Sequence, residues 1–186
     1  EFKSAQKKKS YQEYLEKLVA VRNSKQPFNV NVRTNKENYE IKDKIIFNIE
    51  TDRDGYLTLL DINPNGDITV IFPNKFHRDN FIRAGKTTQV PSPSYGFEFH
   101  LQGPAGLERI KAIVTLNKIS LLALDLDDGF HNVKRGTPLG TRTIVALATQ
   151  VDSIDSSSWS ETYSEIFIFN EGERYTRGSR KIPILE

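Results

Sequence analysis

The segment YLTLLDINPNGDITVIF, residues 56–72, decides the fold class because it contains two strands and the turn that joins them. Apolar residues dominate Tyr56–Ile62 and recur at alternate positions in Asp67–Phe72. The four residues between these runs, Asn63-Pro64-Asn65-Gly66, are types that favour tight turns. We therefore predict a β-hairpin here.

The same alternation continues on both sides of the hairpin. It recurs at Phe28, Val30 and Val32; at Phe47 and Ile49; at Phe97, Phe99 and Leu101; and at Ile110, Ala112, Val114 and Leu116. A period of two is typical of half-buried antiparallel strands. Because turn-forming residues separate the strands and no helices alternate with them, the sequence predicts an all-β fold. The expected architecture is an antiparallel, immunoglobulin-like β-sandwich.

Specific residues are expected in the core of this sandwich. They are Phe47, Ile49, Leu59, Val70, Phe72 and Phe99, with either Ile113 or Val114, and either Ile166 and Ile168 or Phe167 and Phe169. The alternatives stay open because a shift of one residue exchanges the two faces of a strand. Glu165–Asn170 is apolar on both faces, which predicts a central strand. Gly55 is expected to supply turn geometry that a side chain would resist.

The chain divides into three predicted parts. Residues 1–26 form an amphipathic helix and linker, residues 27–170 form the sandwich, and residues 171–186 form a loose tail. The helix, at residues 5–22, has an apolar stripe of Tyr11, Tyr14, Leu15, Leu18 and Val19. We expect this stripe to pack on the sandwich or on a second copy of the chain. For residues 141–151, strand and helix remain open.

Charge and composition limit the function. The chain has 26 basic and 24 acidic residues, and seven basic against three acidic residues fall within positions 1–26. The remaining body is slightly acidic, so we expect no nucleic-acid partner. The longest apolar run, Ile144–Ala148, is too short for a transmembrane segment, although a membrane anchor upstream stays possible. The lack of cysteine and methionine favours an extracytoplasmic location, periplasmic or at the cell surface.

Several stretches carry a resemblance to a bacterial family. They are Tyr39–Phe47, Asp52–Leu60, Asn65-Gly66, Phe72-Pro73-Asn74, Asn80–Gly85, Pro91 and Gly106–Val114. In this order and spacing, over roughly residues 29–119, they resemble the domain-of-unknown-function family numbered 4384. The resemblance implies an all-β accessory module of bacterial envelope proteins and lipoproteins, also found appended to caspase-like peptidases and kinases. It supplies no catalytic residue.

The turn residues of the hairpin are also the best metal candidates. Asp61, Asn63, Asn65 and Asp67 place oxygen ligands at alternate positions, as in the first half of a calcium loop. The carboxylate expected at the end of such a loop is replaced by Phe72. We therefore predict a turn without a metal. The three histidines lack zinc-ligand spacing, and no cofactor is expected.

A binding surface is predicted in the long polar segment 73–97. Its aromatic and imidazole residues are Phe76, His77, Phe81 and Tyr95, and the single tryptophan, Trp159, could join Tyr95 to line a groove for a carbohydrate or a peptide. The alternative interpretation is that Phe81 and Phe97 only cap the core.

The function hypotheses follow from what the sequence lacks. It has no Gly-x-Ser-x-Gly nucleophile elbow and no glycine-rich phosphate loop. We predict a non-catalytic binding or scaffolding module that acts through a protein partner. The alternatives are a hydrolase or other enzyme with an unrecognised site, and a carbohydrate-binding module.

Overall fold

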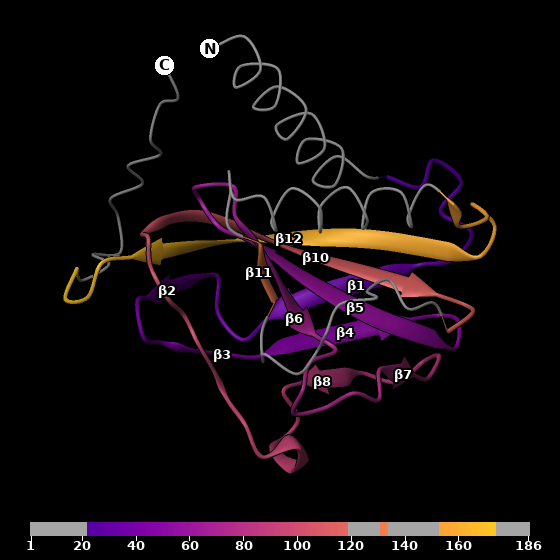
Figure 1. Ribbon diagram of the computed structural model, residues 1–186, viewed down its shortest axis with the longest axis horizontal. Helices are drawn as coiled ribbons and strands as arrows, with labels where there is room; N and C mark the ends of the chain where they lie inside the picture. Colours follow the sequence, from indigo (N-terminus) through magenta and orange to yellow (C-terminus); the bar gives the residue numbers. More distant parts are fainter. Residues whose placement is uncertain (1–21, 119–130, 134–152, 174–186) are drawn as a thin grey trace, which may run out of the picture.

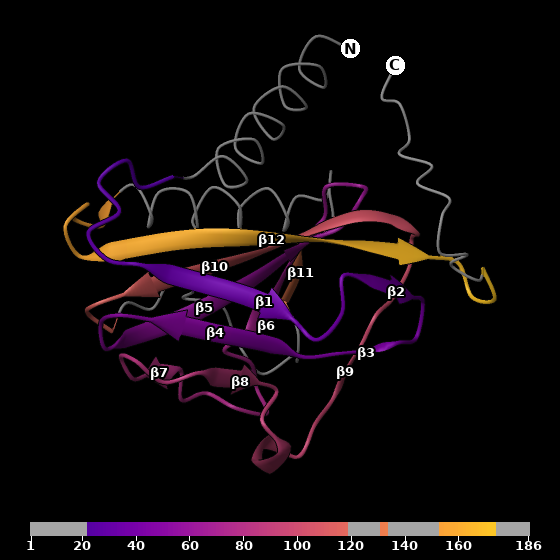
Figure 2. The same cartoon turned by 180° about the vertical axis from the view of Figure 1, so that it is seen from behind.

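The computed structural model describes residues 22–118, 131–133 and 153–173, and these residues form an all-β fold (Figures 1 and 2). The strands are β1 (Val30–Thr34), β2 (Asn38–Glu40), β3 (Lys44–Ile45), β4 (Phe47–Thr51), β5 (Gly55–Ile62), β6 (Ile68–Phe72), β7 (Phe81–Ile82), β8 (Thr88–Val90), β9 (Phe99–His100), β10 (Gly106–Thr115), β11 (His131–Val133) and β12 (Trp159–Phe169), with a short 3-10 helix η1 (Pro93–Tyr95). The predicted helix before Arg22, the segment 141–151 and the tail beyond Glu173 lie outside the described residues. Within the described part, no helix is long and apolar enough to cross a membrane.

The strands form three sheets. A three-stranded sheet has the order β1-β4-β8, and a two-stranded sheet pairs β3 with β9. A seven-stranded sheet has the order β11-β6-β5-β10-β12-β2, with β7 also paired to β5. In both views the long strands β10 and β12 run alongside each other, with β1 and β4 next to them (Figures 1 and 2).

The predicted hairpin is confirmed. Strands β5 and β6 pair antiparallel, with Leu60 opposite Val70 and Ile62 opposite Ile68. The register shifts between Leu59, which pairs with Phe72, and Leu60, which pairs with Val70, so Ile71 is an extra residue in β6.

The last strand is central, as its apolar character predicted. Strand β12 pairs antiparallel with β10 on one side and parallel with β2 on the other. The parallel pair departs from the expected antiparallel pattern. Strand β2 pairs with a strand more than a hundred residues away, and local alternation carries no signal for such a partner.

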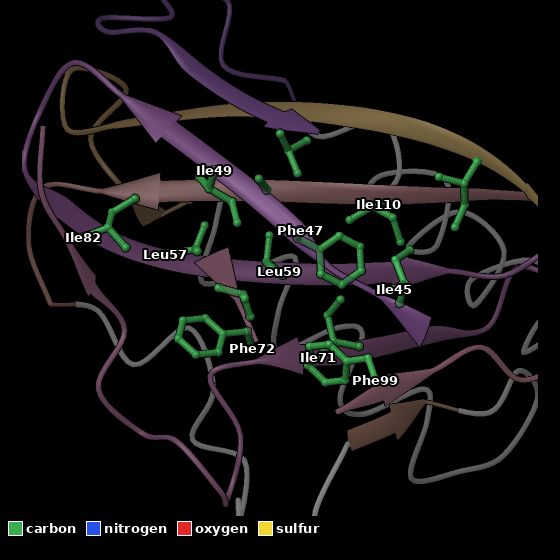
Figure 3. Packing of buried hydrophobic residues seen from close by; sticks show 14 of the residues in the cluster. Ile45, Phe47, Ile49, Leu57, Leu59, Ile71, Phe72, Ile82, Phe99 and Ile110 are labelled. Atoms are coloured by element: carbon green, nitrogen blue, oxygen red, sulfur yellow. The ribbon is translucent and has the colours of Figure 1, made fainter. Parts of the chain in front are cut away.

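One apolar cluster joins side chains from both larger sheets (Figure 3). Five predicted core residues belong to it, namely Phe47, Ile49, Leu59, Phe72 and Phe99. Each large apolar side chain removed from water contributes about 1.5–3 kcal/mol before the entropy cost of ordering it. The cluster therefore holds the two sheets together.

The opposite face of the seven-stranded sheet is also buried where β5, β6 and the second half of β10 lie. Val70, the sixth predicted core residue, is buried on that face beside its partner Leu60. Val114 belongs to the apolar cluster, which resolves the choice between Ile113 and Val114, and Ile113 is buried on the opposite face. From Ile110 onward, strand β10 is covered on both faces, which alternation alone cannot indicate.

Strand β12 resolves the other open choice. Ile166 and Ile168 are buried in the apolar cluster, whereas Phe167 and Phe169 are half-buried on the opposite face. The two phenylalanine rings contact each other there, with centroids 4.7 Å apart.

Gly55 has a different role from the one expected. It begins β5, and a Cβ atom at this position would lie 2.7 Å from Val114 Cγ1 and 2.8 Å from the Thr115 carbonyl oxygen. The close approach of β5 and β10, and not turn geometry, requires glycine. Gly66 in the hairpin turn, by contrast, has a φ of 79° and open space around it.

We predict that Gly55→Ala lowers the free energy of unfolding by about 2–3 kcal/mol, because the added methyl group forces β5 away from β10. The measurement is urea denaturation followed by circular dichroism. Gly66→Asn is the control and should be nearly neutral, because asparagine tolerates the left-handed conformation. Equal losses for the two variants would contradict this explanation of Gly55.

Candidate binding site

Four rings from two separate segments form one exposed surface, which we call the aromatic surface. It consists of Phe76 and His77 from the loop after β6, and of Tyr95 and Phe97 from η1 and the residue beyond its glycine. Phe76 is 52% exposed, and the other three are half-buried. The structure thus brings together three of the five predicted binding residues.

Stacking holds these rings in place. His77 and Tyr95 stack with centroids 3.7 Å apart and planes 14° from parallel, and Tyr95 also lies parallel to the buried Phe72. Phe76 contacts Phe97 at 5.6 Å. Because the exposed rings rest on buried aromatic side chains, the surface is rigid before any partner arrives.

The backbone of the loop is fixed by Asn74, which is fully buried. Its Oδ1 accepts hydrogen bonds from the backbone N–H groups of Phe76 and His77, at 2.9 and 3.0 Å. Its Nδ2 donates to the Ile71 carbonyl oxygen at 2.9 Å. Asparagine side chains commonly hydrogen-bond to the backbone of their own turn in this way. Here these bonds fix the backbone of Phe76 and His77, which carry two of the rings.

The segment that carries the aromatic surface is basic. Between residues 73 and 97 there are four basic residues, Lys75, Arg78, Arg83 and Lys86, and one acidic residue, Asp79. Lys75 Nζ lies 5.1 Å from the centre of the Phe76 ring. Burial, and then the charge of Asp79, raise the pKa of Tyr95, so its hydroxyl stays a neutral donor.

A groove of about 470 Å³ adjoins this surface at Phe97. Pro91, Pro93 and Gln89 line it together with the ion pair of Lys44 and Glu98.

The other two predicted binding residues lie elsewhere. Phe81 is on β7, where its ring meets Tyr56 edge to face with centroids 5.4 Å apart. Trp159 is 5% exposed and begins β12, opposite Thr115 of β10. The structure does not bring Trp159 to Tyr95, so no groove is shared by these two rings.

The predicted metal candidates serve the hairpin turn. Asn63 Oδ1 accepts from the backbone N–H groups of Asn65 and Asp67, at 3.0 and 2.9 Å, and Asn63 Nδ2 donates to Asp67 Oδ2 at 3.2 Å. Asp61 lies on β5 and faces a cavity instead. Within the described ranges, no three His, Cys, Asp or Glu side chains are grouped to hold a metal ion.

This cavity, which we call the carboxyl cavity, has a volume of about 640 Å³. Six apolar side chains form part of its wall, including Ile45, Phe47, Ile71 and Leu101. Two carboxyl groups, Asp61 and Glu108, are set into that wall. Burial raises the pKa of Asp61 to about 7, and burial together with the Asp61 charge raises the pKa of Glu108 to about 9.

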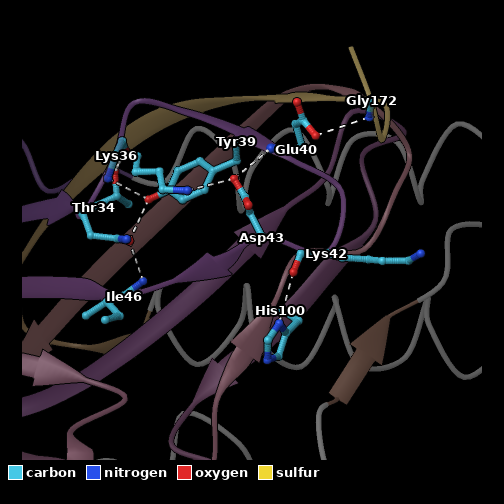
Figure 4. A network of polar contacts seen from close by, with 10 residues as sticks. Thr34, Lys36, Tyr39, Glu40, Lys42, Asp43, Ile46, His100 and Gly172 are labelled. Atoms are coloured by element: carbon cyan, nitrogen blue, oxygen red, sulfur yellow. Dashed lines mark hydrogen bonds and ion pairs between the residues drawn. The ribbon is translucent and has the colours of Figure 1, made fainter. Parts of the chain in front are cut away.

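A polar network fixes the part of the cavity wall formed by β3 and β9 (Figure 4). The buried Tyr39 hydroxyl donates to Asn35 Oδ1 at 2.9 Å, and the same oxygen accepts from the Ile46 N–H at 2.8 Å. The Glu40 N–H and then the Lys36 ammonium lower the pKa of Asp43. Asp43 thus ties the turn after β2 to Glu40 of β2 and to Lys36 before it.

Sequence reasoning missed Glu108, although a signal for it exists. Glu108 falls in phase with Ile110, Ala112 and Val114 on the face of β10 that meets the apolar cluster. A carboxylate in phase with the apolar face of a strand is buried, and it therefore requires a partner or a proton.

The described residues define an all-β domain with an exposed aromatic surface and a cavity lined by two carboxyl groups. Residues 38–118 match the family described as Domain of unknown function (DUF4384), which confirms the resemblance seen in the sequence. The match includes the hairpin, the aromatic surface and both carboxyl groups. Comparisons with curated proteins and with solved structures gave no match.

Proposed function

We propose that residues 27–170 form one mainly antiparallel, immunoglobulin-like β-sandwich that acts as a non-catalytic binding module. Support for the sandwich comes from the apolar cluster, to which the three-stranded and seven-stranded sheets both contribute. Support for binding comes from the aromatic surface. Its rigid rings are displayed on loops at one end of these sheets, as binding residues commonly are.

The partner is a protein segment that combines an apolar side chain with acidic residues. The observation that carries this proposal is Phe76, which is 52% exposed although Asn74 and Phe97 hold it in one position. An apolar side chain of the partner covers Phe76, and acidic residues meet the surrounding basic charges of Lys75 and Arg78.

A displayed library of short random peptides, selected against the immobilised chain, tests this proposal. We expect the enriched peptides to contain acidic residues beside an aromatic or leucine residue. Phe76→Ala should weaken their binding by about tenfold or more, because the central apolar anchor is lost. Added salt should also weaken binding, since basic charges steer the acidic peptide.

Leu107→Ala is the matched control, because Leu107 is 51% exposed but lies on β10, away from the aromatic surface. This variant should bind the selected peptides as tightly as the wild type does. If Phe76→Ala binds them equally well, or if only oligosaccharides are retained, the proposed protein-binding role is wrong.

We also propose an extracytoplasmic location, periplasmic or at the cell surface. The absence of cysteine and methionine from all 186 residues supports this location, because both side chains are oxidation-sensitive. Antibody detection after fractionation of the producing bacterium tests it, and recovery in the cytoplasmic fraction would overturn it.

A further inference from the structure

We propose that the carboxyl cavity binds an organic cation, an alkylammonium or alkylguanidinium group, through Asp61 and Glu108. The apolar wall would contact the alkyl arm, and the two carboxyl groups would hold the charged head. This site is separate from the aromatic surface, and neither the hairpin turn nor the peptide-binding role requires it.

The two carboxyl groups converge from neighbouring strands. Asp61 lies opposite Ile110 in the β5–β10 pair, and Glu108 is two residues before Ile110 on the same face. They are therefore diagonal neighbours across the two strands. The two side chains lie within hydrogen-bonding reach of each other, and a hydrogen bond between two carboxyl groups requires that one of them carries a proton.

Each carboxyl group keeps one buried oxygen without a donor. Among the described residues, nothing donates a hydrogen bond to Asp61 Oδ1 or to Glu108 Oε2. Glu108 is only 2% exposed, so water does not compensate freely for the missing bond. A buried polar atom without a partner costs free energy that a ligand N–H group would recover.

The charge of the lining selects a cation. The other ionisable groups that line the cavity in the described part of the chain are Glu98 and His100. Both are about half exposed, His100 Nε2 lies 3.2 Å from Glu98 Oε2, and Glu98 is also paired with Lys44. No lysine or arginine among the described lining residues neutralises the two buried carboxyl groups.

The wall favours an organic cation over a metal ion. Calcium requires six to eight oxygen ligands, whereas the two buried carboxyl groups of this cavity lie among six apolar lining side chains, such as Ile45 and Phe47. An ammonium or guanidinium group needs only the two carboxyl groups, and guanidinium N–H groups match carboxylate oxygens in pairs. A cavity of about 640 Å³ holds such a head group together with its alkyl arm.

The pKa values of the pair predict how binding depends on pH. Burial raises both pKa values, to about 7 for Asp61 and about 9 for Glu108, so a bound cation must displace the proton that the pair carries. Removal of that proton becomes easier as pH rises. Cation binding should therefore strengthen by about tenfold or more from pH 6 to pH 8.5.

Isothermal titration calorimetry of the full chain with n-butylguanidinium chloride tests the inference. We expect saturable binding of one cation, tighter at pH 8.5 than at pH 6, with proton release seen as a dependence of the heat on the buffer. n-Butanol, which has the same arm without the charge, should bind at least about tenfold more weakly. Equal binding of n-butanol would show a purely apolar cavity and would overturn the proposal.

Variants and competing ligands complete the test. The double variant Asp61→Asn/Glu108→Gln should lose cation binding, whereas Leu107→Ala, outside the cavity, and Phe76→Ala on the aromatic surface should retain it. Saturable binding of calcium chloride that blocks n-butylguanidinium would overturn the proposal in favour of a metal site. The absence of saturable cation binding to the wild type at both pH values would also refute it.

A blocked peptide, acetyl-Gly-Arg-Gly-amide, separates two sources of the same cation. If it competes with n-butylguanidinium, the site accepts an arginine side chain of a partner protein. If only the free alkyl cation binds, the ligand is a small molecule. Both results support the cation site.

Discussion

At pH 8, the double variant Asp61→Asn/Glu108→Gln is expected to be more stable than the wild type. Its free energy of unfolding should be higher by about 2–4 kcal/mol. Asparagine and glutamine keep the shape of the two buried side chains and remove the charge. In the wild type, the folded state at this pH either buries a carboxylate or retains a proton that the unfolded chain releases. Both alternatives cost free energy.

The sign of the pH dependence follows from the direction of the shifts. Both pKa values are higher in the folded chain, at about 7 and about 9, than the ordinary carboxyl values that apply after unfolding. The folded state therefore binds more protons between about pH 4.5 and pH 9, and stability falls as pH rises through this window. The contribution is fully present below the unfolded pKa values and is lost above the folded ones.

Urea denaturation at pH 5, 7 and 9 measures this effect. The wild type should lose several kcal/mol across the series, and the double variant should lose much less. Glu98→Gln serves as the control, because Glu98 is exposed and its pKa is lowered, mainly by Lys44, so it titrates below the window. A wild type whose stability does not change between pH 5 and pH 9 would contradict the raised pKa values.

The second large effect is expected at Lys111 and Glu161 on the other face of the seven-stranded sheet. Their charged atoms lie 3.3 Å apart, and the side chains are only 2% and 5% exposed. Burial lowers the pKa of Lys111, and Glu161 opposes that shift. Gln26 Nε2 donates to Glu161 Oε1 at 3.2 Å, which ties the segment before β1 to this pair.

Lys111→Met should lower the free energy of unfolding by about 3–5 kcal/mol, because it leaves the Glu161 carboxylate buried without its counter-charge. The double variant Lys111→Met/Glu161→Leu should recover most of this loss or exceed the wild type, since two apolar side chains need no compensation. A double-mutant cycle, measured by urea denaturation, gives both numbers and the coupling energy.

The exposed pair of Lys42 and Glu171 provides the control. Its charged atoms are only 2.7 Å apart, but the side chains are 71% and 64% exposed. Glu171→Gln should change stability by less than about 1 kcal/mol. If Lys111→Met costs no more than Glu171→Gln, burial does not set the strength of the Lys111–Glu161 pair.

The hairpin shows which features local sequence predicts well. The turn at Asn63–Gly66 and the strands beside it depend on residues adjacent in the chain, and the structure reproduces them with β5 and β6. The aromatic surface was predicted in part. Phe76, His77 and Tyr95 fell within the segment 73–97, but stacking on Phe72 depends on a contact across the fold.

Other features required the position of distant strands. Whether Ile113 is buried or faces solvent depends on what covers the second face of β10. The alternation of apolar residues along the strand is the same whether that face is covered or not. The choice of Ile166 and Ile168 over Phe167 and Phe169 has the same origin, because it depends on which side of β12 meets the apolar cluster.

The sequence by itself determined the strands, the turns and the all-β class, because backbone propensity and a period of two act over a few neighbouring residues. Only the tertiary structure decided that Asp61 and Glu108 share one cavity and that Lys111 and Glu161 form a buried pair. The members of each pair are separated by about fifty residues along the chain. The strand order β5-β10-β12 brings them together, and burial then raises or lowers their pKa values, since a charge that leaves water requires a partner or a change of protonation.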